Sequence, residues 1–122
     1  MASIKPNISV QYGEDVTVIA FTDEKILEES DIRGLQNSIS SVIEQTEGIK
    51  LVMDFGSVKF LSSAVLGLLI RISKRVYEGG GQLALCSIDP KILQIFKITR
   101  LTNIFDIYDD IESATKGLTE SG

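Results

Sequence analysis

The sequence contains no histidine, and its 122 residues include only one cysteine, Cys86. The lack of histidine excludes Ser-His and Cys-His nucleophile pairs, phosphohistidine chemistry and histidine-based metal sites. A lone cysteine cannot form an internal disulfide, which fits a reducing compartment, and it leaves a zinc site with too few ligands. We therefore expect no metal, no cofactor, and binding in place of catalysis.

Basic residues are also fewer than acidic ones. The chain has 12 Lys and Arg but 17 Asp and Glu, which gives a net charge of −5. A nucleic-acid binder needs clustered cations to contact phosphates, whereas the longest basic cluster here, Arg71, Lys74 and Arg75, has the spacing of one solvated helix face. No apolar run approaches the ~20 residues of a membrane span, and no charged and then apolar leader opens the chain. The sequence predicts a cytoplasmic protein that binds neither nucleic acid nor membrane.

Hydrophobic residues are plentiful enough for a core. They make up 43% of the chain and charged residues 24%, which is ordinary for a soluble domain. A chain of this length has the size of one domain and buries enough surface to fold without a disulfide or metal. We expect a single domain over residues 1–122, with its core over about 7–117 and a short flexible C-terminal tail.

Hydrophobic patterning predicts an alternation of strands and helices. Strands are expected at residues 8–11, 16–21, 49–55, 83–86 and 104–108, the first two forming a hairpin. Helices are expected at 30–45, from 62 or 63 to the glycines at 79–81, from the Asp89-Pro90 cap onward, and at 109–117. Such alternation predicts an α/β domain with a mixed, largely parallel central sheet of about five strands and about four helices.

Several side chains have specific expected roles within this framework. Ser30 is expected to cap the first helix. The loop before that helix should contain one buried anchor, either Ile26 or Leu27. Val58 and Phe60 are expected to pack inward from the loop that precedes the second helix.

Two adjacent serines, Ser62 and Ser63, stand where this loop enters the second helix. The simplest interpretation is that a hydroxyl caps the helix, because serine is among the commonest N-cap residues. The second interpretation is a phosphorylation site, since a helix N-terminus offers free N–H groups and Leu61, Ala64 and Val65 bring no carboxylate that would repel a phosphate. A phosphoryl group adds a charge of about −1.5 to −2, enough to disturb an adjoining apolar interface.

The helix after the serines is apolar nearly all round in its first two turns. One stripe is expected to face the core, while Leu66 and Ile70 lie on the other flank. These two side chains are either covered by a neighbouring element or form part of an exposed patch for a partner. Because the polar residues gather in the second half of the helix, any such patch would adjoin the serines.

Three further features could belong to a phosphate-handling or acidic site, but each has a simpler structural interpretation. Asp54 stands near the end of the central strand, where receiver domains carry a phospho-accepting aspartate, yet Glu14 and Asp15 lie in the hairpin turn and not where a magnesium site needs them. The glycines at 79–81 follow a helix and are not a phosphate loop. Asp23, in the loop before the first helix, is most simply part of an Asx-type turn.

The segment LVMDF at 51–55, followed by VKFLSSAVLG at 58–67, resembles the signature of the STAS domain. The chain as a whole resembles a stand-alone anti-sigma factor antagonist, from the opening hairpin to the segment at 96–101. The resemblance implies a STAS-like fold and a partner-switching function. Members of the family bind an anti-sigma factor that is itself a serine kinase, and a serine phosphatase reverses the phosphorylation.

By position, the resemblance implies that Ser63 is the phosphoacceptor, with Ser62 as the fallback, and that Asp23 is a loop acid near the acceptor surface. The expected partner-binding surface comprises Asp23, Leu61, Ser62, Ser63, Leu66 and Ile70. Two alternatives remain open. One is a constitutive interaction or scaffold domain whose serines only cap the helix, and the other is a small-ligand or nucleotide-binding module, which rests on fold analogy alone.

Overall fold

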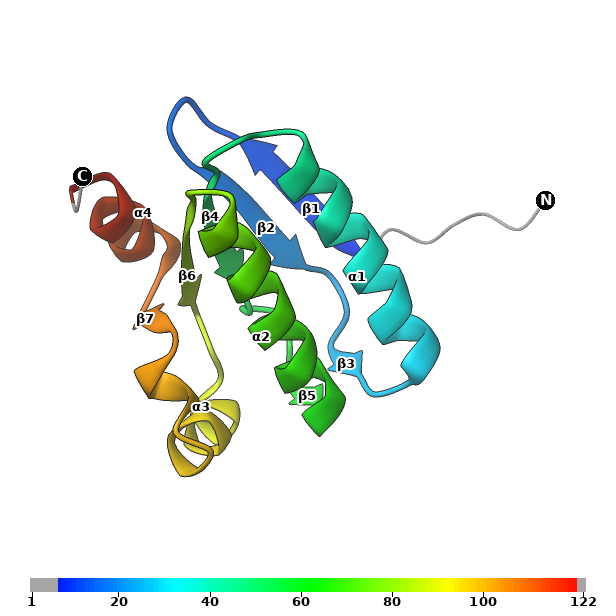
Figure 1. Ribbon diagram of the computed structural model, residues 1–122. Coiled ribbons are helices and arrows are strands. Elements are labelled where there is room, and N and C mark those ends of the chain that lie inside the picture. The colour runs from blue at the N-terminus through cyan, green and yellow to red at the C-terminus, as the bar shows by residue number, and fades with distance from the viewer. Residues whose placement is uncertain (1–6, 121–122) are drawn as a thin grey trace.

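A five-stranded mixed sheet forms the centre of the molecule in the computed structural model, which describes residues 7–120. The strands are β1 (Ile8–Tyr12), β2 (Thr17–Phe21), β4 (Lys50–Asp54), β6 (Gln82–Cys86) and β7 (Asp106–Tyr108), in the order β1-β2-β4-β6-β7 (Figure 1). β1 pairs antiparallel with β2, as the expected hairpin requires, and the other neighbours are parallel. The predicted α/β class with a mixed sheet is confirmed.

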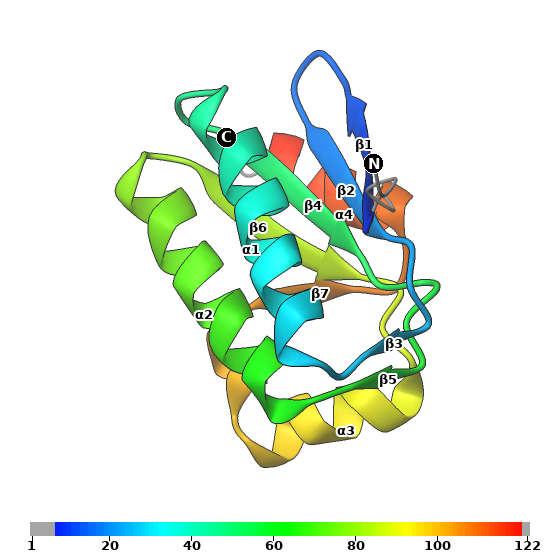
Figure 2. The same cartoon turned by 90° about the vertical axis from the view of Figure 1, so that its right-hand side faces the viewer.

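The α-helices of the described residues are α1 (Glu29–Glu44), α2 (Ser63–Glu78), α3 (Pro90–Ile98) and α4 (Ile111–Glu120). α1 and α2 lie side by side on one face of the sheet, α4 covers the opposite face, and α3 lies at the end of the molecule where α2 begins (Figures 1 and 2). The main core fills the space between α1, α2 and the sheet. β4 and β6 are covered on both faces, which explains why they read as continuous apolar runs.

A two-stranded parallel ribbon of β3 (Lys25–Ile26) and β5 (Phe60–Leu61) replaces two segments that the sequence predicts as loops. Ile26 is the buried anchor, and Val58 packs inward as expected. The inward orientation predicted for Phe60 is wrong, because residues of a strand point alternately to opposite sides and Leu61 takes the inner one.

The helix starts agree only in part with the expected caps. Asp89 caps α3, since its carboxylate accepts a hydrogen bond from Lys91 N–H at 2.9 Å. The assignment of Ser30 as a cap is wrong: α1 begins at Glu29, after Glu28, which makes no side-chain capping bond. The N-cap is therefore two residues nearer the β3–β5 ribbon than capping propensity suggests.

The C-terminal part also departs from the prediction in detail. A short 3₁₀ turn (Leu101–Asn103) precedes β7, so that strand begins later than expected. α4 continues beyond the predicted end at Gly117 to Glu120, with Leu118 buried against the sheet. The rest of the expected tail, residues 121–122, lies outside the described residues, as do residues 1–6. Over residues 7–120, the helices are all too short or too polar to cross a membrane.

Candidate functional site

The β3–β5 ribbon holds the two serines in position at the start of α2. The ladder continues past β5, where Ser62 N–H donates a hydrogen bond to the carbonyl oxygen of Ile26 at 3.0 Å. Ser62 has the extended backbone of an N-cap residue (φ −86°, ψ 162°), and Ser63 is the first residue of the helix. The start of α2 is thus anchored by a segment that is distant in the sequence.

The side chain of Ser62 does not cap the helix, although its backbone occupies the N-cap position. Its Oγ is buried and has no hydrogen-bond partner among residues 7–120. A buried hydroxyl without a partner is unfavourable, because it gives up its hydrogen bonds to water. The capping interpretation is therefore wrong for the side chain of Ser62, and burial leaves this oxygen little access to a kinase.

Ser63, in contrast, is exposed at the first position of α2. The first turn carries no acidic residue. Its leading N–H groups have no acceptor within the helix, so this end carries a partial positive charge. An anionic group on the Ser63 oxygen would be stabilised by both features.

Ser63 lines a groove between the starts of α1 and α2, which we call the serine groove. It has a volume of about 600 Å³, and its lining residues include Leu27, Arg33, Ser63, Gly67 and Arg71. The groove is therefore open to a macromolecular partner and places two guanidinium groups on the same surface as the Ser63 hydroxyl. Guanidinium is the side-chain group best suited to hold a phosphate, because its planar donors match two phosphate oxygens.

The two arginines keep most of their capacity for an anion. Arg33 pairs with Glu29 at 3.6 Å, but both side chains are largely exposed and such pairs are weak. Arg71 forms no salt bridge with any residue of the described range 7–120. Sequence reasoning assigns Arg71 to a solvated face and does not single out Arg33, because only the packing of α1 beside α2 brings them to one groove.

Of the apolar residues of α2 that the sequence assigns to a partner-binding surface, one is buried and the other is exposed. Leu66 is 7% exposed and belongs to the main core, so its assignment to an exposed patch is wrong. The reason is that α2 packs against both the sheet and α1, so it is covered on two sides. Ile70 is 41% exposed, as a docking residue must be, while Leu61 is half-buried at the end of β5.

Asp23 lies away from the serine groove. β3 begins two residues after Asp23, β5 ends two residues before Ser63, and the strands run parallel, so the two side chains stand at opposite ends of the ribbon. Glu29 is the acidic residue that lines the groove with Ser63. A contact of Asp23 with a partner stays a prediction.

The other reactive side chains of residues 7–120 do not gather into a site. In that range, acidic and cysteine side chains form no group of three or more that could hold a metal ion. The Asp54 carboxylate accepts a hydrogen bond from Gly56 N–H at 2.9 Å, the role of an Asx turn. Burial raises the pKa of the Cys86 thiol to about 11, so this thiol stays protonated at neutral pH.

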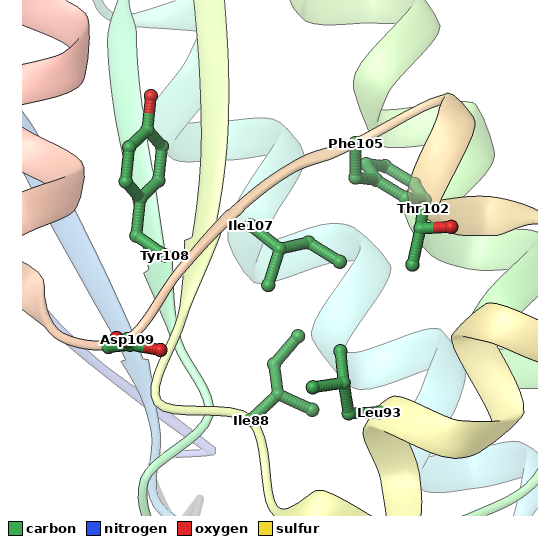
Figure 3. A pocket seen from close by; sticks show the side chains of 7 residues that line it. All are labelled: Ile88, Leu93, Thr102, Phe105, Ile107, Tyr108 and Asp109. Carbon is green, nitrogen blue, oxygen red and sulfur yellow. The ribbon is translucent and has the colours of Figure 1, made fainter.

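Another hollow lies at the carboxyl ends of β6 and β7, the edge at which α/β sheets often bind ligands. Its volume is about 370 Å³, and Ile88, Leu93 and Ile107 point toward one another within it (Figure 3). Asp109 contributes the charged group at its border, and neither lysine nor arginine lines it. The hollow lacks the cations that hold a nucleotide phosphate and gives the nucleotide-binding alternative no support.

The sequence matches a known protein family. A family model described as STAS domain matches residues 7–114. The anti-sigma F factor antagonist of Paenibacillus polymyxa is 22% identical over 103 residues, which cover 84% of this chain and 86% of that protein.

Solved structures show the same fold. An anti-sigma-factor antagonist (STAS) domain protein from Planctomyces limnophilus has a TM-score of 0.84 at 24% identity, over 92% of this chain and 97% of that chain. The Bacillus cell fate determinant SpoIIAA in its phosphorylated form has a TM-score of 0.67 at 15% identity, over 89% of this chain and 97% of that chain. Since the family model spans most of the sequence and the five-stranded sheet with its helices matches these structures, the chain belongs to the STAS domain family.

Proposed function

We propose that this chain is an anti-sigma factor antagonist, a regulatory binding module that docks an anti-sigma factor over the serine groove. Its family membership and the names of the Paenibacillus and Planctomyces proteins support the proposal. The groove supplies a surface of suitable kind, since it is open and combines apolar with charged side chains. Ile70 lies one turn after Gly67, so it extends the same side of α2 with an exposed apolar side chain.

We further propose that the anti-sigma factor is a serine kinase that phosphorylates Ser63, and that a serine phosphatase reverses the reaction. The observation that carries this proposal is the exposed hydroxyl at the free N-terminus of α2, in a groove lined by Arg33 and Arg71. A phosphoryl group would add about −1.5 to −2 of charge and would attract the arginines that otherwise remain available to the partner. Phosphorylation should therefore weaken docking.

Phosphoryl transfer from ATP by the partner kinase tests the assignment of Ser63. The wild-type chain should gain the mass of one phosphoryl group, and Ser63→Ala should abolish the gain. Ser30→Ala is the matched control, because Ser30 is also an exposed serine in the first turn of a helix. Ser62→Ala should accept phosphate like the wild type, since the Ser62 oxygen is buried.

Binding measured by calorimetry separates the switch from the constitutive alternative. Ser63→Glu, which places a negative charge in the groove, should lower the affinity for the anti-sigma factor on the order of tenfold, whereas Ser30→Glu should not. Phosphorylation that persists in Ser63→Ala would contradict the acceptor assignment. Tight binding without any phosphoryl transfer would instead identify a constitutive interaction domain.

A further inference from the structure

A second groove lies between the β3–β5 ribbon and α3, and we call it the lysine groove. Its volume is about 350 Å³, and its lining residues include the apolar Leu27, Phe60 and Ile95 and the basic Lys25, Lys59 and Lys91. No acidic residue lines it. Leu27 also lines the serine groove, so the two grooves meet at this side chain.

The apolar side chains of the lysine groove are exposed well beyond what the core requires. Phe60 is 52% exposed, Leu27 51% and Ile95 39%. Neighbouring exposed apolar side chains with a polar rim are typical of a protein-binding surface. The lysine stems add to this surface, since the Lys25 amine lies over the Phe60 ring at 5.5 Å from its centre.

The charge of the groove is opposite to that of the chain. The protein carries a net charge of −5, yet three lysines surround this one hollow. Lys59 approaches Asp89 only to 3.9 Å, and Lys25 and Lys91 form no salt bridge within residues 7–120. The positive potential here is therefore only partly offset and would attract an acidic partner.

We propose that the lysine groove binds a short acidic, amphipathic segment of a protein partner. Apolar side chains of that segment cover Phe60, Leu27 and Ile95, and its carboxylates contact the lysines. A small ligand fits less well, because such ligands are mostly enclosed, whereas these lining side chains remain about half exposed. A second copy of this chain is disfavoured by the net charge of −5 on each copy.

This inference deepens the proposed function, because it names the chemistry of a segment that the anti-sigma factor would contribute. Because Leu27 lines both grooves, one protein partner can contact the serine groove and the lysine groove at the same time. The contact over the lysine groove would persist when Ser63 is phosphorylated, since Ser63 does not line it.

Titration of the labelled protein with a synthetic peptide, followed by NMR, tests the inference without any anti-sigma factor or ATP. The probe has leucines at helical three- and four-residue spacing and glutamates between them, and the control peptide has lysines in place of the glutamates. We expect the glutamate peptide to shift amide signals of the β3–β5 ribbon and α3, and high salt to weaken its binding. The lysine peptide should bind on the order of tenfold more weakly than the glutamate peptide, because its lysines repel those of the groove.

Matched variants locate the contact. The double variant Lys59→Glu, Lys91→Glu should weaken binding of the glutamate peptide about tenfold. The double variant Lys74→Glu, Lys116→Glu has the same change of charge at exposed lysines that line neither groove, and it should not weaken binding. Ile95→Ser should also weaken binding, whereas Ile111→Ser should not, although Ile111 is exposed to a similar extent at 37%. Circular dichroism and thermal unfolding check that each variant is folded.

The inference would be overturned by signal shifts confined to other surfaces, by equal binding of the two peptides, or by an unchanged affinity in the lysine double variant. Laurate, a small anionic amphiphile, is titrated in the same way. If it shifts the same signals more strongly than the peptide, the groove binds a small amphiphile. If the protein forms a concentration-dependent dimer with the same shifts, the groove binds a second copy of the chain. None of these outcomes bears on phosphorylation of Ser63, so the two proposals fail separately.

Discussion

Ser62 and Ser63 are neighbours in the sequence but differ in the exposure and the surroundings of their hydroxyl groups. The Ser62 oxygen is buried without a partner in the described part of the chain, whereas Ser63 is exposed in a groove that contains two arginines. Ser62 still has the extended backbone of the ribbon, to which its N–H is bonded, whereas Ser63 is already the first residue of α2, so the two hydroxyls lie in different surroundings. One residue along the chain thus separates an inaccessible oxygen from a candidate acceptor.

The unsatisfied hydroxyl of Ser62 predicts an unusual response to mutation. Ser62→Ala should leave the free energy of unfolding unchanged or raise it by about 1 kcal/mol, because it removes a buried polar group that forms no hydrogen bond. Asp89→Ala should lower the free energy of unfolding by about 1 kcal/mol, because Asp89 caps α3. Urea unfolding of both variants measures the difference. A clear loss of stability in Ser62→Ala would mean that its hydroxyl does form a hydrogen bond in solution.

Cys86 is buried between the sheet and α4, and its burial raises the pKa of its thiol from 9.0 to about 11. We expect a thiol reagent at pH 8 to label the native protein on the order of a hundredfold more slowly than the unfolded chain. Because the folded pKa lies above the unfolded one, the thiol contributes its stability fully below about pH 9 and loses it between about pH 9 and 11. Cys86→Ala should therefore show a smaller fall in unfolding free energy over that range.

Contacts at both ends fix the position of helix α2. The β3–β5 ribbon holds its start, and at the turn that leads from α2 into β6 the backbone at Gly81 lies against Ile49. A Cβ on Gly81 would overlap the carbonyl oxygen of Ile49 and would lie 3.0 Å from Val76 Cγ1. Only glycine lets the chain pass this close to β4.

Gly81→Ala should lower the free energy of unfolding by about 1–3 kcal/mol, because backbone atoms must move to admit the methyl group. Gly67→Ala is the control within α2. A Cβ added at Gly67 would lie 3.6 Å from an Arg71 guanidinium nitrogen, which is an ordinary van der Waals contact. That change should raise stability by about 0.5–1 kcal/mol through helix propensity. Equal effects of the two substitutions in thermal or urea unfolding would contradict the close approach at Gly81.

At the scale of the whole molecule, the sheet is covered on both faces, but unequally. Figure 2 shows α1 and α2 on one face of the sheet and α4 on the other. α1 and α2 cover the main core, whereas α4 covers a smaller cluster that includes Val52, Ala84 and Leu118. The end of α4 is therefore a structural part of the fold. It also keeps Cys86 away from solvent.

Leu118→Ala should lower the free energy of unfolding by about 2–4 kcal/mol, because it opens a cavity between α4 and the sheet. Thr119→Ala, at the exposed neighbouring position, should change it by less than about 0.5 kcal/mol. The same Leu118 variant should label faster at Cys86. A Leu118 variant as stable as the Thr119 variant would show that α4 does not hold this layer.

Much of the architecture could be predicted because strands and helices leave local patterns. The apolar runs of β4 and β6, the hairpin and the Asp89-Pro90 start of α3 all follow from nearby residues. The ribbon could not be predicted, because β3 and β5 are each only two residues long and each is stabilised by the other. The burial of Leu66 could not be predicted for a similar reason, because it depends on α1, which the pattern of its own helix does not reveal.

Composition and short-range periodicity are enough to predict the α/β class, the lack of histidine chemistry and the place of the serines at a helix start. Which hydroxyl faces solvent, which arginines share its groove and where three lysines surround exposed apolar side chains depend on the packing of the folded chain. These features depend on contacts between segments that are far apart along the chain. Such contacts form only when the sheet order and the packing of the helices bring those segments together.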